Sequence, residues 1–188
     1  MNAVRFVASI FCLVAVSMAE NCKPLTSKQQ SFLASKGIFV PEDYCYILGI
    51  GIYKLHEDLA VWNDARHICN DEGGRLAIIN SKEEAEALKE MYTDSDLMYE
   101  LGRPSQDVLL GFHDIYNEGE FVTILGQTME EAGFDEWSQV GGKQPKNNDG
   151  WDNVQNCGAM AVDGKLDDVA CGSEYGFICE ISMSKHRF

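Results

Sequence analysis

The residues best suited to chemistry in this 188-residue chain are an adjacent pair of acids, Asp167 and Asp168, and four histidines. Neither a His-Glu-x-x-His motif nor a Gly-x-Ser-x-Gly motif is present. Adjacent residues on a strand point to opposite sides, so the two carboxylates are poorly placed to act together as catalysts. Metal ligation or loop support explains them better. The sequence therefore predicts a binding protein and no enzyme. The histidines are His56, His67, His113 and His186.

Residues 1–19 have the pattern of a secretory signal peptide. Arg5 gives a positive start, an apolar stretch follows, and the small residues Ser17 and Ala19 occupy the −3 and −1 positions of a cleavage site. The stretch is short for a membrane span. We therefore expect a secreted, extracellular protein. Its expected parts are the signal (1–19), an N-terminal extension with Cys22 (20–43), one domain (44–181) and a C-terminal tail (182–188).

Six cysteines remain once the signal and Cys12 are removed. An even number in an oxidising compartment predicts three disulfides and no free thiol. Four of the six lie in two distant clusters, which should hold the segment from about Gly111 to Asp168 closed. Any specific function should therefore lie in that segment. Cys22 could instead bridge two chains.

The chain is strongly acidic, with a formal net charge of −15 at pH 7. Nucleic acid and anionic membranes both attract basic surfaces. The charge therefore argues against either of them as a primary partner.

Periodicity predicts the elements that position the candidate residues. Ser81 and Glu84 form a capping box at the start of one helix. Residues 130–156 have little periodicity and several turn signals, which is typical of a long, structured, functional loop. Residues 20–43 read as a polar leader. Strands are expected within 44–55, 76–79, 108–113, 121–125, 159–162 and 175–180, and helices over 59–70 and from Ser81 to about Met91.

A series of motifs, in their order along the chain, resembles the C-type lectin-like domain. The residues of several of these motifs further resemble those of secreted insect immune lectins, including haemolymph lipopolysaccharide-binding proteins. The resemblance implies an α+β fold with two helices, two small antiparallel sheets and a long structured ligand loop. It also implies the disulfides Cys69–Cys179 and Cys157–Cys171, which leaves Cys22–Cys45 as a long-form bridge. The motifs are Tyr53–Leu55, Trp62–Cys69, Gly74–Ser81, Leu110–Asp114, Glu118–Gly119, Trp137, Gln144–Pro145, Cys157, Asp167–Cys171 and Phe177–Glu180.

In the family, the long loop binds calcium, and the residues that coordinate the ion also bind two neighbouring sugar hydroxyls. The matching positions of this principal site are Gln144, Lys146, Gln155, Asp167 and Asp168. Calcium takes about six to eight oxygen ligands, but Gln155 is neutral and Lys146 offers only donors. We therefore expect calcium binding at the principal site to be weak or absent.

Two alternatives concern Lys146. A one-residue slip of the loop would turn the amide oxygen of Asn147 inward and restore a ligand. Conversely, the ammonium of Lys146 could sit near Asp167 and Asp168 as a built-in cation, or simply be a solvated loop lysine.

Two further points concern candidate binding residues. An auxiliary calcium site maps to Asp114, Glu118, Asn147 and Asn156, although the two acids could equally cap turns. Trp151 lies in a polar turn, where its indole could stack on a sugar ring or pack down on the loop.

The function implied is recognition of microbial surface glycans in innate immunity. The alternative is a protein-binding member that has lost calcium-dependent sugar recognition.

Overall fold

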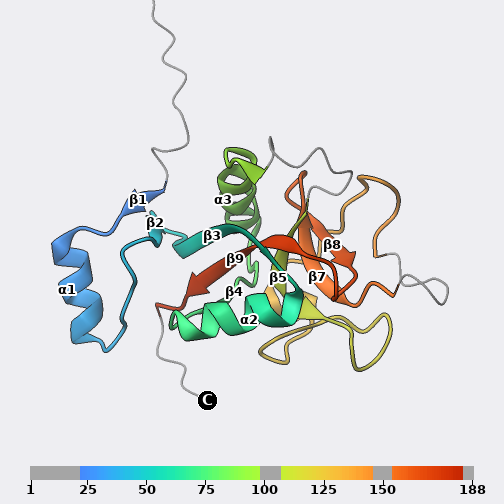
Figure 1. Cartoon of the computed structure of the whole chain (residues 1–188), viewed down its shortest axis with the longest axis horizontal. Helices are drawn as coiled ribbons and strands as arrows, with labels where there is room; N and C mark the ends of the chain where they lie inside the picture. The colour runs from blue at the N-terminus through green and yellow to red at the C-terminus, as the bar shows by residue number, and fades with distance from the viewer. Residues whose placement is uncertain (1–21, 98–106, 146–153, 184–188) are drawn as a thin grey trace, which may run out of the picture.

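The computed structural model describes residues 22–97, 107–145 and 154–183. The strands join into one nine-stranded sheet in the order β1-β2-β3-β9-β5-β7-β8, with β4 beside β9 and β6 beside β5 (Figure 1). The strands are β1 (Lys23–Pro24), β2 (Cys45–Ile47), β3 (Gly51–Ala60), β4 (Arg75–Leu76), β5 (Asp107–His113), β6 (Val122–Thr123), β7 (Cys157–Ala161), β8 (Leu166–Val169) and β9 (Tyr175–Ile181). The helices are α1 (Ser27–Ser35), α2 (Trp62–Asp71), α3 (Lys82–Thr93) and α5 (Met129–Ala132).

Helix α2 forms where helical spacing predicted it. Trp62, Ala65 and Cys69 are its buried residues, and their spacing of three and four places them on one face. The indole Nε1 of Trp62 donates to the carbonyl of Leu110 at 2.8 Å, which fixes the helix to β5. The helix begins three residues later than predicted, because β3 continues to Ala60.

Helix α3 begins at the predicted cap, where the Ser81 hydroxyl accepts from the backbone N–H of Glu84 at 3.1 Å. The Glu84 carboxylate does not complete the predicted capping box. It accepts instead from the backbone N–H of Asn80 at 2.8 Å and from the Tyr53 hydroxyl. Burial of the Glu84 side chain beneath β3 explains the difference, since it leaves that carboxylate 1% exposed.

The centre of the sheet combines both strand directions. β9 pairs antiparallel with β3, and Tyr53 lies opposite Glu180. β9 also pairs parallel with β5, and Val108 lies opposite Gly176. The resemblance implied two small antiparallel sheets. The parallel pairing of β5 with β9 instead joins the strands into one hydrogen-bonded sheet. The predicted α+β class is confirmed.

Two hydrophobic clusters form the core. One includes Ala85 and Leu88 of α3, and the other includes the buried face of α2. Trp62 is buried in the core, whereas Trp137 is partly buried and packs against the α3 cluster, with its ring centre 4.8 Å from that of Phe121. The long loop is thereby joined to a rigid scaffold.

Other elements differ in extent from the sequence prediction. The polar leader contains helix α1, and the segment without periodicity contains helix α5. Of the strand predicted over 76–79, only Arg75–Leu76 forms a regular strand, paired with β9. The next residue, Ala77, makes isolated backbone hydrogen bonds: its N–H donates to the carbonyl of Ile178 and its carbonyl accepts from the N–H of Gly111, both at 2.8 Å. The strand predicted over 121–125 is only Val122–Thr123.

Three disulfides close the structure, and they are the pairs that the resemblance implied: Cys22–Cys45, Cys69–Cys179 and Cys157–Cys171. The bridge Cys69–Cys179 spans 110 residues of sequence. Closing so long a loop removes much of the freedom of the unfolded chain. None of the helices in the described ranges is long and apolar enough to cross a membrane.

Candidate functional site

The β7–β8 hairpin positions the acidic pair. Asp167 and Asp168 lie opposite Ala159 and Gly158, and both acids are buried, at 7% and 0% exposure. The backbone N–H of Asp168 donates to Oδ1 of Asp167 at 2.8 Å. The pair is therefore held within a ladder of backbone bonds and is not a mobile surface feature.

Gln155 connects the end of the long loop to this hairpin. Its Nε2 donates to the backbone carbonyl of Asp168 at 2.8 Å. A carboxylate at this position could not make that bond, because it has no donor when ionised. The neutral amide thus has a specific structural partner.

Gln144 lies on the loop itself, before a cis peptide bond to Pro145. Its side chain is only 4% exposed, and its Oε1 has no hydrogen-bond partner among the described residues. A buried amide oxygen left unpaired costs about 1–3 kcal/mol. Such an atom is suited to accept from a ligand.

The auxiliary positions lie where β5 ends and β7 begins. The backbone N–H of Asp114 donates to the carbonyl of Asn156 at 3.2 Å, so the two side chains leave adjacent points of the backbone. Oδ2 of Asp114 accepts from the backbone N–H of Gly119 at 2.8 Å, which is the predicted turn cap. Oδ1 of Asp114 and Oδ1 of Asn156 are buried and lack a partner in the described part of the chain. Glu118 is exposed on the same turn.

Two of these atoms, Oδ1 of Asp114 and Oδ1 of Asn156, are called the loop-end oxygens. Carboxylate and amide oxygens are the ligands that calcium prefers. The donor set at Asp114 and Asn156 therefore fits a calcium ion better than the principal set does, where Oδ1 of Asp167 already accepts an internal hydrogen bond. Lys146, Asn147 and Trp151 lie outside the described residues.

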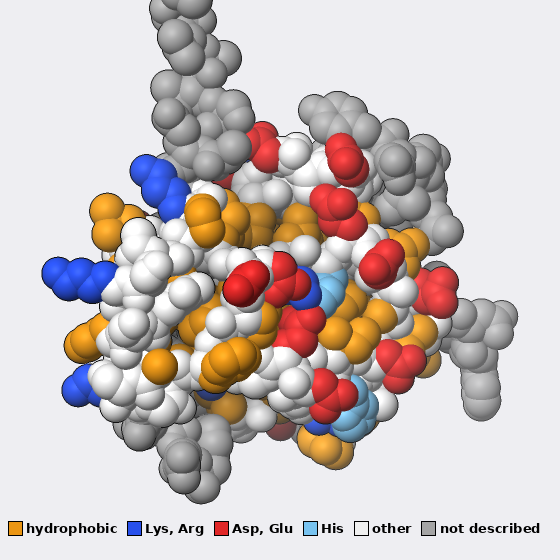
Figure 2. All heavy atoms as spheres, turned by 60° about the vertical axis from the view of Figure 1, so that its left-hand side comes forward, with side chains coloured by type: hydrophobic (Ala, Val, Ile, Leu, Met, Phe, Trp, Pro, Cys, Tyr) orange, Lys and Arg blue, Asp and Glu red, His pale blue; other side chains and the backbone are white. Residues whose placement is uncertain are grey.

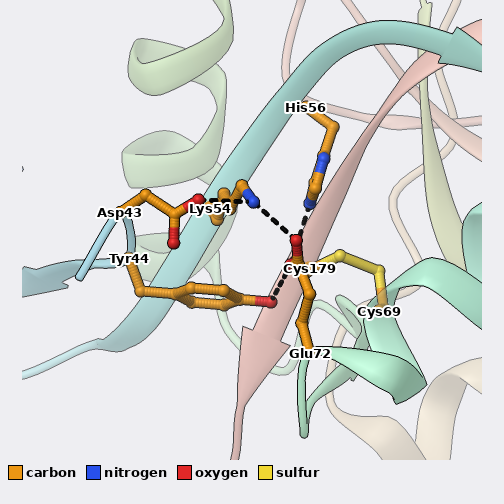
Figure 3. Close-up of polar contacts among 7 residues, drawn as sticks. All are labelled: Asp43, Tyr44, Lys54, His56, Cys69, Glu72 and Cys179. Carbon is orange, nitrogen blue, oxygen red and sulfur yellow. Dashed lines mark hydrogen bonds and ion pairs between the residues drawn. A yellow bond between two sulfur atoms is a disulfide. The ribbon is translucent and has the colours of Figure 1, made fainter. Parts of the chain in front are cut away.

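A second polar cluster, here the Glu72 cluster, lies beside the Cys69–Cys179 disulfide (Figure 3). Glu72, at the end of α2, accepts from the Tyr44 hydroxyl at 2.8 Å and from Lys54 at 2.6 Å, and its other partner is His56 at 3.0 Å. Lys54 also pairs with Asp43 at 2.6 Å. The members are Asp43, Tyr44, Lys54, His56 and Glu72.

The electrostatics of the Glu72 cluster suit a structural role. Burial alone would raise the pKa of Glu72, but hydrogen bonds from Lys54 and Tyr44 outweigh it and hold the pKa below its usual value. His56 and Glu72 lie close to Cys179, a grouping that resembles a metal site. Cys179 is in a disulfide, so it offers no thiolate and the group is unsuited to a metal.

The sequence prediction did not identify the Glu72 cluster or a second buried group around Glu180. Glu180 pairs with Arg75 at 2.5 Å and is 7% exposed, beside an open hollow of about 280 Å³. Burial raises the pKa of Glu180 to about 7. No local spacing signals either group, because strand pairing brings their members together from distant positions.

Comparisons with known proteins agree with this geometry. A sequence model of the lectin C-type domain matches residues 59–181. The hemolymph lipopolysaccharide-binding protein of Periplaneta americana is 37% identical over 145 residues, which cover 77% of this chain and 54% of that protein. The chain thus spans about half the length of that relative.

Two solved structures illustrate the fold. The carbohydrate-recognition domain of cow CD23, determined in the presence of a GlcNAc2Man3 oligosaccharide, matches with a TM-score of 0.57 and 26% identity, over 77% of this chain and 98% of that one. A calcium-independent type II antifreeze protein matches with a TM-score of 0.55 and 22% identity, over 76% and 93%. From the sequence match and the shared fold, this chain belongs to the C-type lectin domain family.

Proposed function

We propose that this chain is a secreted carbohydrate-binding protein that recognises microbial surface glycans in innate immunity. The observation that carries the proposal is that Oε1 of Gln144 on the long loop is buried and has no hydrogen-bond partner within the described ranges. A sugar hydroxyl is a donor of the kind that this oxygen lacks. The lipopolysaccharide-binding relative supports a microbial glycan as the ligand.

The proposed sugar site uses the principal positions. Gln144 accepts from a sugar hydroxyl, while Gln155, Asp167 and Asp168 form the floor of the site. Lys146 and Asn147 contribute further polar contacts, and Trp151 stacks on a pyranose ring. These roles rest on the family resemblance and on the positions of the described residues.

We assign calcium to the auxiliary positions and not to the sugar contact. Asp114 and Asn156 would hold the ion, with Glu118 and Asn147 completing its shell. Their support is the pair of buried oxygens that lack partners in the described residues. When bound, the ion supplies positive charge that fixes the loop end. Sugar binding then depends on calcium only through the order of the loop.

A glycan array tests the sugar site. The mature protein should bind bacterial polysaccharides, and Gln144→Ala combined with Trp151→Ala should lose at least tenfold in affinity. Val154→Ala is the matched control, because Val154 is an exposed residue, at 55%, next to Gln155. Equal loss in the control would contradict a specific loop site.

Chelation separates the two calcium positions. If calcium coordinated the sugar directly, chelation would abolish sugar binding. If calcium occupies only the auxiliary positions, chelation should weaken sugar binding only in part. The protein-binding alternative would be favoured if no glycan on the array is bound and a defined secreted protein binds through the loop. Lys146 and the neutral Gln155 are the features on which that alternative rests.

Secretion is tested on the culture medium of cells that express the full chain. The secreted protein should begin at Glu20, as read by N-terminal sequencing. A product that stays in the cell with residues 1–19 attached would contradict this part of the proposal.

A further inference from the structure

One part of the N-terminal extension, residues 22–41, has a positive formal charge, with the acids Glu20, Glu42 and Asp43 just outside it. Residues 22–41 contain three lysines, Lys23, Lys28 and Lys36, and no acid, in a chain whose formal net charge is −15. All three lysines are exposed. In Figure 2 the end that carries α1 faces forward, and blue Lys and Arg side chains stand along the left edge, away from the red carboxylates farther right. The acidic total therefore conceals a basic region.

The same region exposes apolar side chains. Leu33 is the only residue of α1 that is buried, while Phe32 is 61% exposed and Phe39, just after the helix, is 80% exposed. A groove of about 330 Å³ lies between α1 and the segment that follows, lined in part by Leu33, Ile38 and Phe39 and, at its end, by Glu42. Large exposed apolar groups that gather in one place are typical of an interaction surface. The surface formed by residues 22–41 is called the N-terminal face.

Charge and apolar surface are interleaved on this face. The Lys36 ammonium lies 5.7 Å from the centre of the Phe32 ring. A lysine beside an aromatic ring can place its charge among headgroups while the ring enters the apolar boundary below them.

The N-terminal face is held in a fixed conformation. Thr26 and Gln29 form a complete capping box at the start of α1. The Cys22–Cys45 disulfide fixes one end of the extension to β2, and the pair between Lys54 and Asp43 fixes the other. Both ends are tied to the sheet, so binding would not require the extension to fold first.

We propose that the N-terminal face docks onto an anionic phospholipid surface. Lys23, Lys28 and Lys36 meet lipid phosphates, and Phe32 and Phe39 enter the boundary between headgroups and acyl chains. The charge complementarity selects this occupant. A neutral apolar partner leaves the lysines unused, and two basic N-terminal faces repel one another.

This proposal goes beyond the proposed glycan site and does not depend on it. The lipid-binding residues lie on the extension, whereas the glycan-binding residues lie on the long loop and the β7–β8 hairpin. A protein with both surfaces would contact a cell envelope through its sugars and through its lipids.

Vesicle co-sedimentation tests the proposal with the mature, oxidised protein. The protein should partition onto vesicles of phosphatidylcholine and phosphatidylglycerol at 4:1 far more strongly than onto phosphatidylcholine alone. A lysine near an anionic surface contributes roughly fivefold in affinity. The combined variant Lys23→Ser, Lys28→Ser, Lys36→Ser should therefore lose roughly 100-fold, and Phe32→Ser with Phe39→Ser should lose at least tenfold.

Two controls match these variants. Lys82→Ser, Lys89→Ser and Lys165→Ser change the net charge equally but lie on or near α3 and β8, so binding should be unchanged. Tyr116→Ser removes an aromatic ring of 88% exposure from another surface and should also bind normally. Equal loss in the control triple, or equal binding to neutral vesicles, would overturn the proposal.

Two further outcomes keep the surfaces distinct. Gln144→Ala with Trp151→Ala should keep vesicle binding even where glycan binding is lost, so failure of one proposal leaves the other intact. If gel filtration shows a dimer that Phe32→Ser and Phe39→Ser dissociate, the N-terminal face is an interface between copies and the lipid proposal is wrong.

Discussion

The Glu72 cluster and the loop-end oxygens are both polar regions packed against the sheet, and they differ in how their atoms are paired. Around Glu72, the carboxylate receives hydrogen bonds from Tyr44 and Lys54 and contacts His56. At the loop end, Oδ1 of Asp114 and Oδ1 of Asn156 are buried without a partner among the described residues. One region is complete as folded, and the other lacks donors.

The difference separates stability from binding. A paired cluster contributes to the folded state directly, and a ligand would have to displace bonds already made. A buried unpaired oxygen costs free energy in the folded state, and a ligand that supplies a cation or a donor offsets this cost. Removing the Glu72 side chain should therefore destabilise the protein under all conditions. Replacing Asp114 by asparagine, which keeps the hydrogen bond from Gly119, should matter mainly when calcium is present.

The largest expected effect is in the Glu72 cluster. Glu72→Ala should lower the free energy of unfolding by about 2–3 kcal/mol, because it leaves Lys54, Tyr44 and His56 without their common acceptor. Urea unfolding followed by circular dichroism measures the change. Calcium should not alter it.

Glu86→Ala is the matched control, since the Glu86 side chain is 59% exposed and pairs with Lys89 of the same helix. Its loss should be below about 0.5 kcal/mol. Equal losses in the two variants would mean that the Glu72 cluster is no more than a set of surface ion pairs.

Much of the fold follows from local spacing, and the exceptions have physical reasons. The pattern of Trp62, Ala65 and Cys69 is sufficient for α2. Helix α1 was missed because it buries Leu33 alone and so has no apolar face. Its signal was a capping box, Thr26 with Gln29, and Thr128 with Glu131 marks α5 in the same way.

The candidate site was predicted through family positions and not through contacts. The sequence placed Asp114 and Asn156 in one site, and the structure brings their backbones into hydrogen-bond contact. The sequence could not show that the amide nitrogen of Gln155 donates to the backbone carbonyl of Asp168. The Glu72 cluster could not be predicted from the sequence, because it depends on how β3 and the end of α2 pack against each other in the fold.

A smaller effect is expected at the loop-end oxygens. In chelator, Asp114→Asn should change stability by less than about 0.5 kcal/mol, because the amide oxygen can still accept from Gly119. With calcium at tenfold above its dissociation constant, the native protein should gain about 1.4 kcal/mol, and the variant should lose most of this gain. Thermal melting with and without calcium measures both values.

Glu130→Gln is a suitable control, since it removes one exposed acid from α5 and should leave the calcium response unchanged. A native protein that does not respond to calcium would contradict the auxiliary assignment. The loop-end oxygens would then have no assigned ligand.

The smallest expected effect concerns His56. Burial lowers the pKa of His56, although Glu72 opposes this, so the folded state favours the neutral ring. The resulting stability is present above pH 6.5 and is lost as the pH falls toward the folded pKa. His56→Gln should remove this loss, so the difference in stability between the variant and the native protein should move in favour of the variant as the pH falls from 7.5 to 5. His113 and Glu180 titrate in both proteins and cancel in the difference. Unfolding in chelator across this range makes the measurement, and a difference independent of pH would mean that the Glu72 cluster holds the charged and neutral rings equally well.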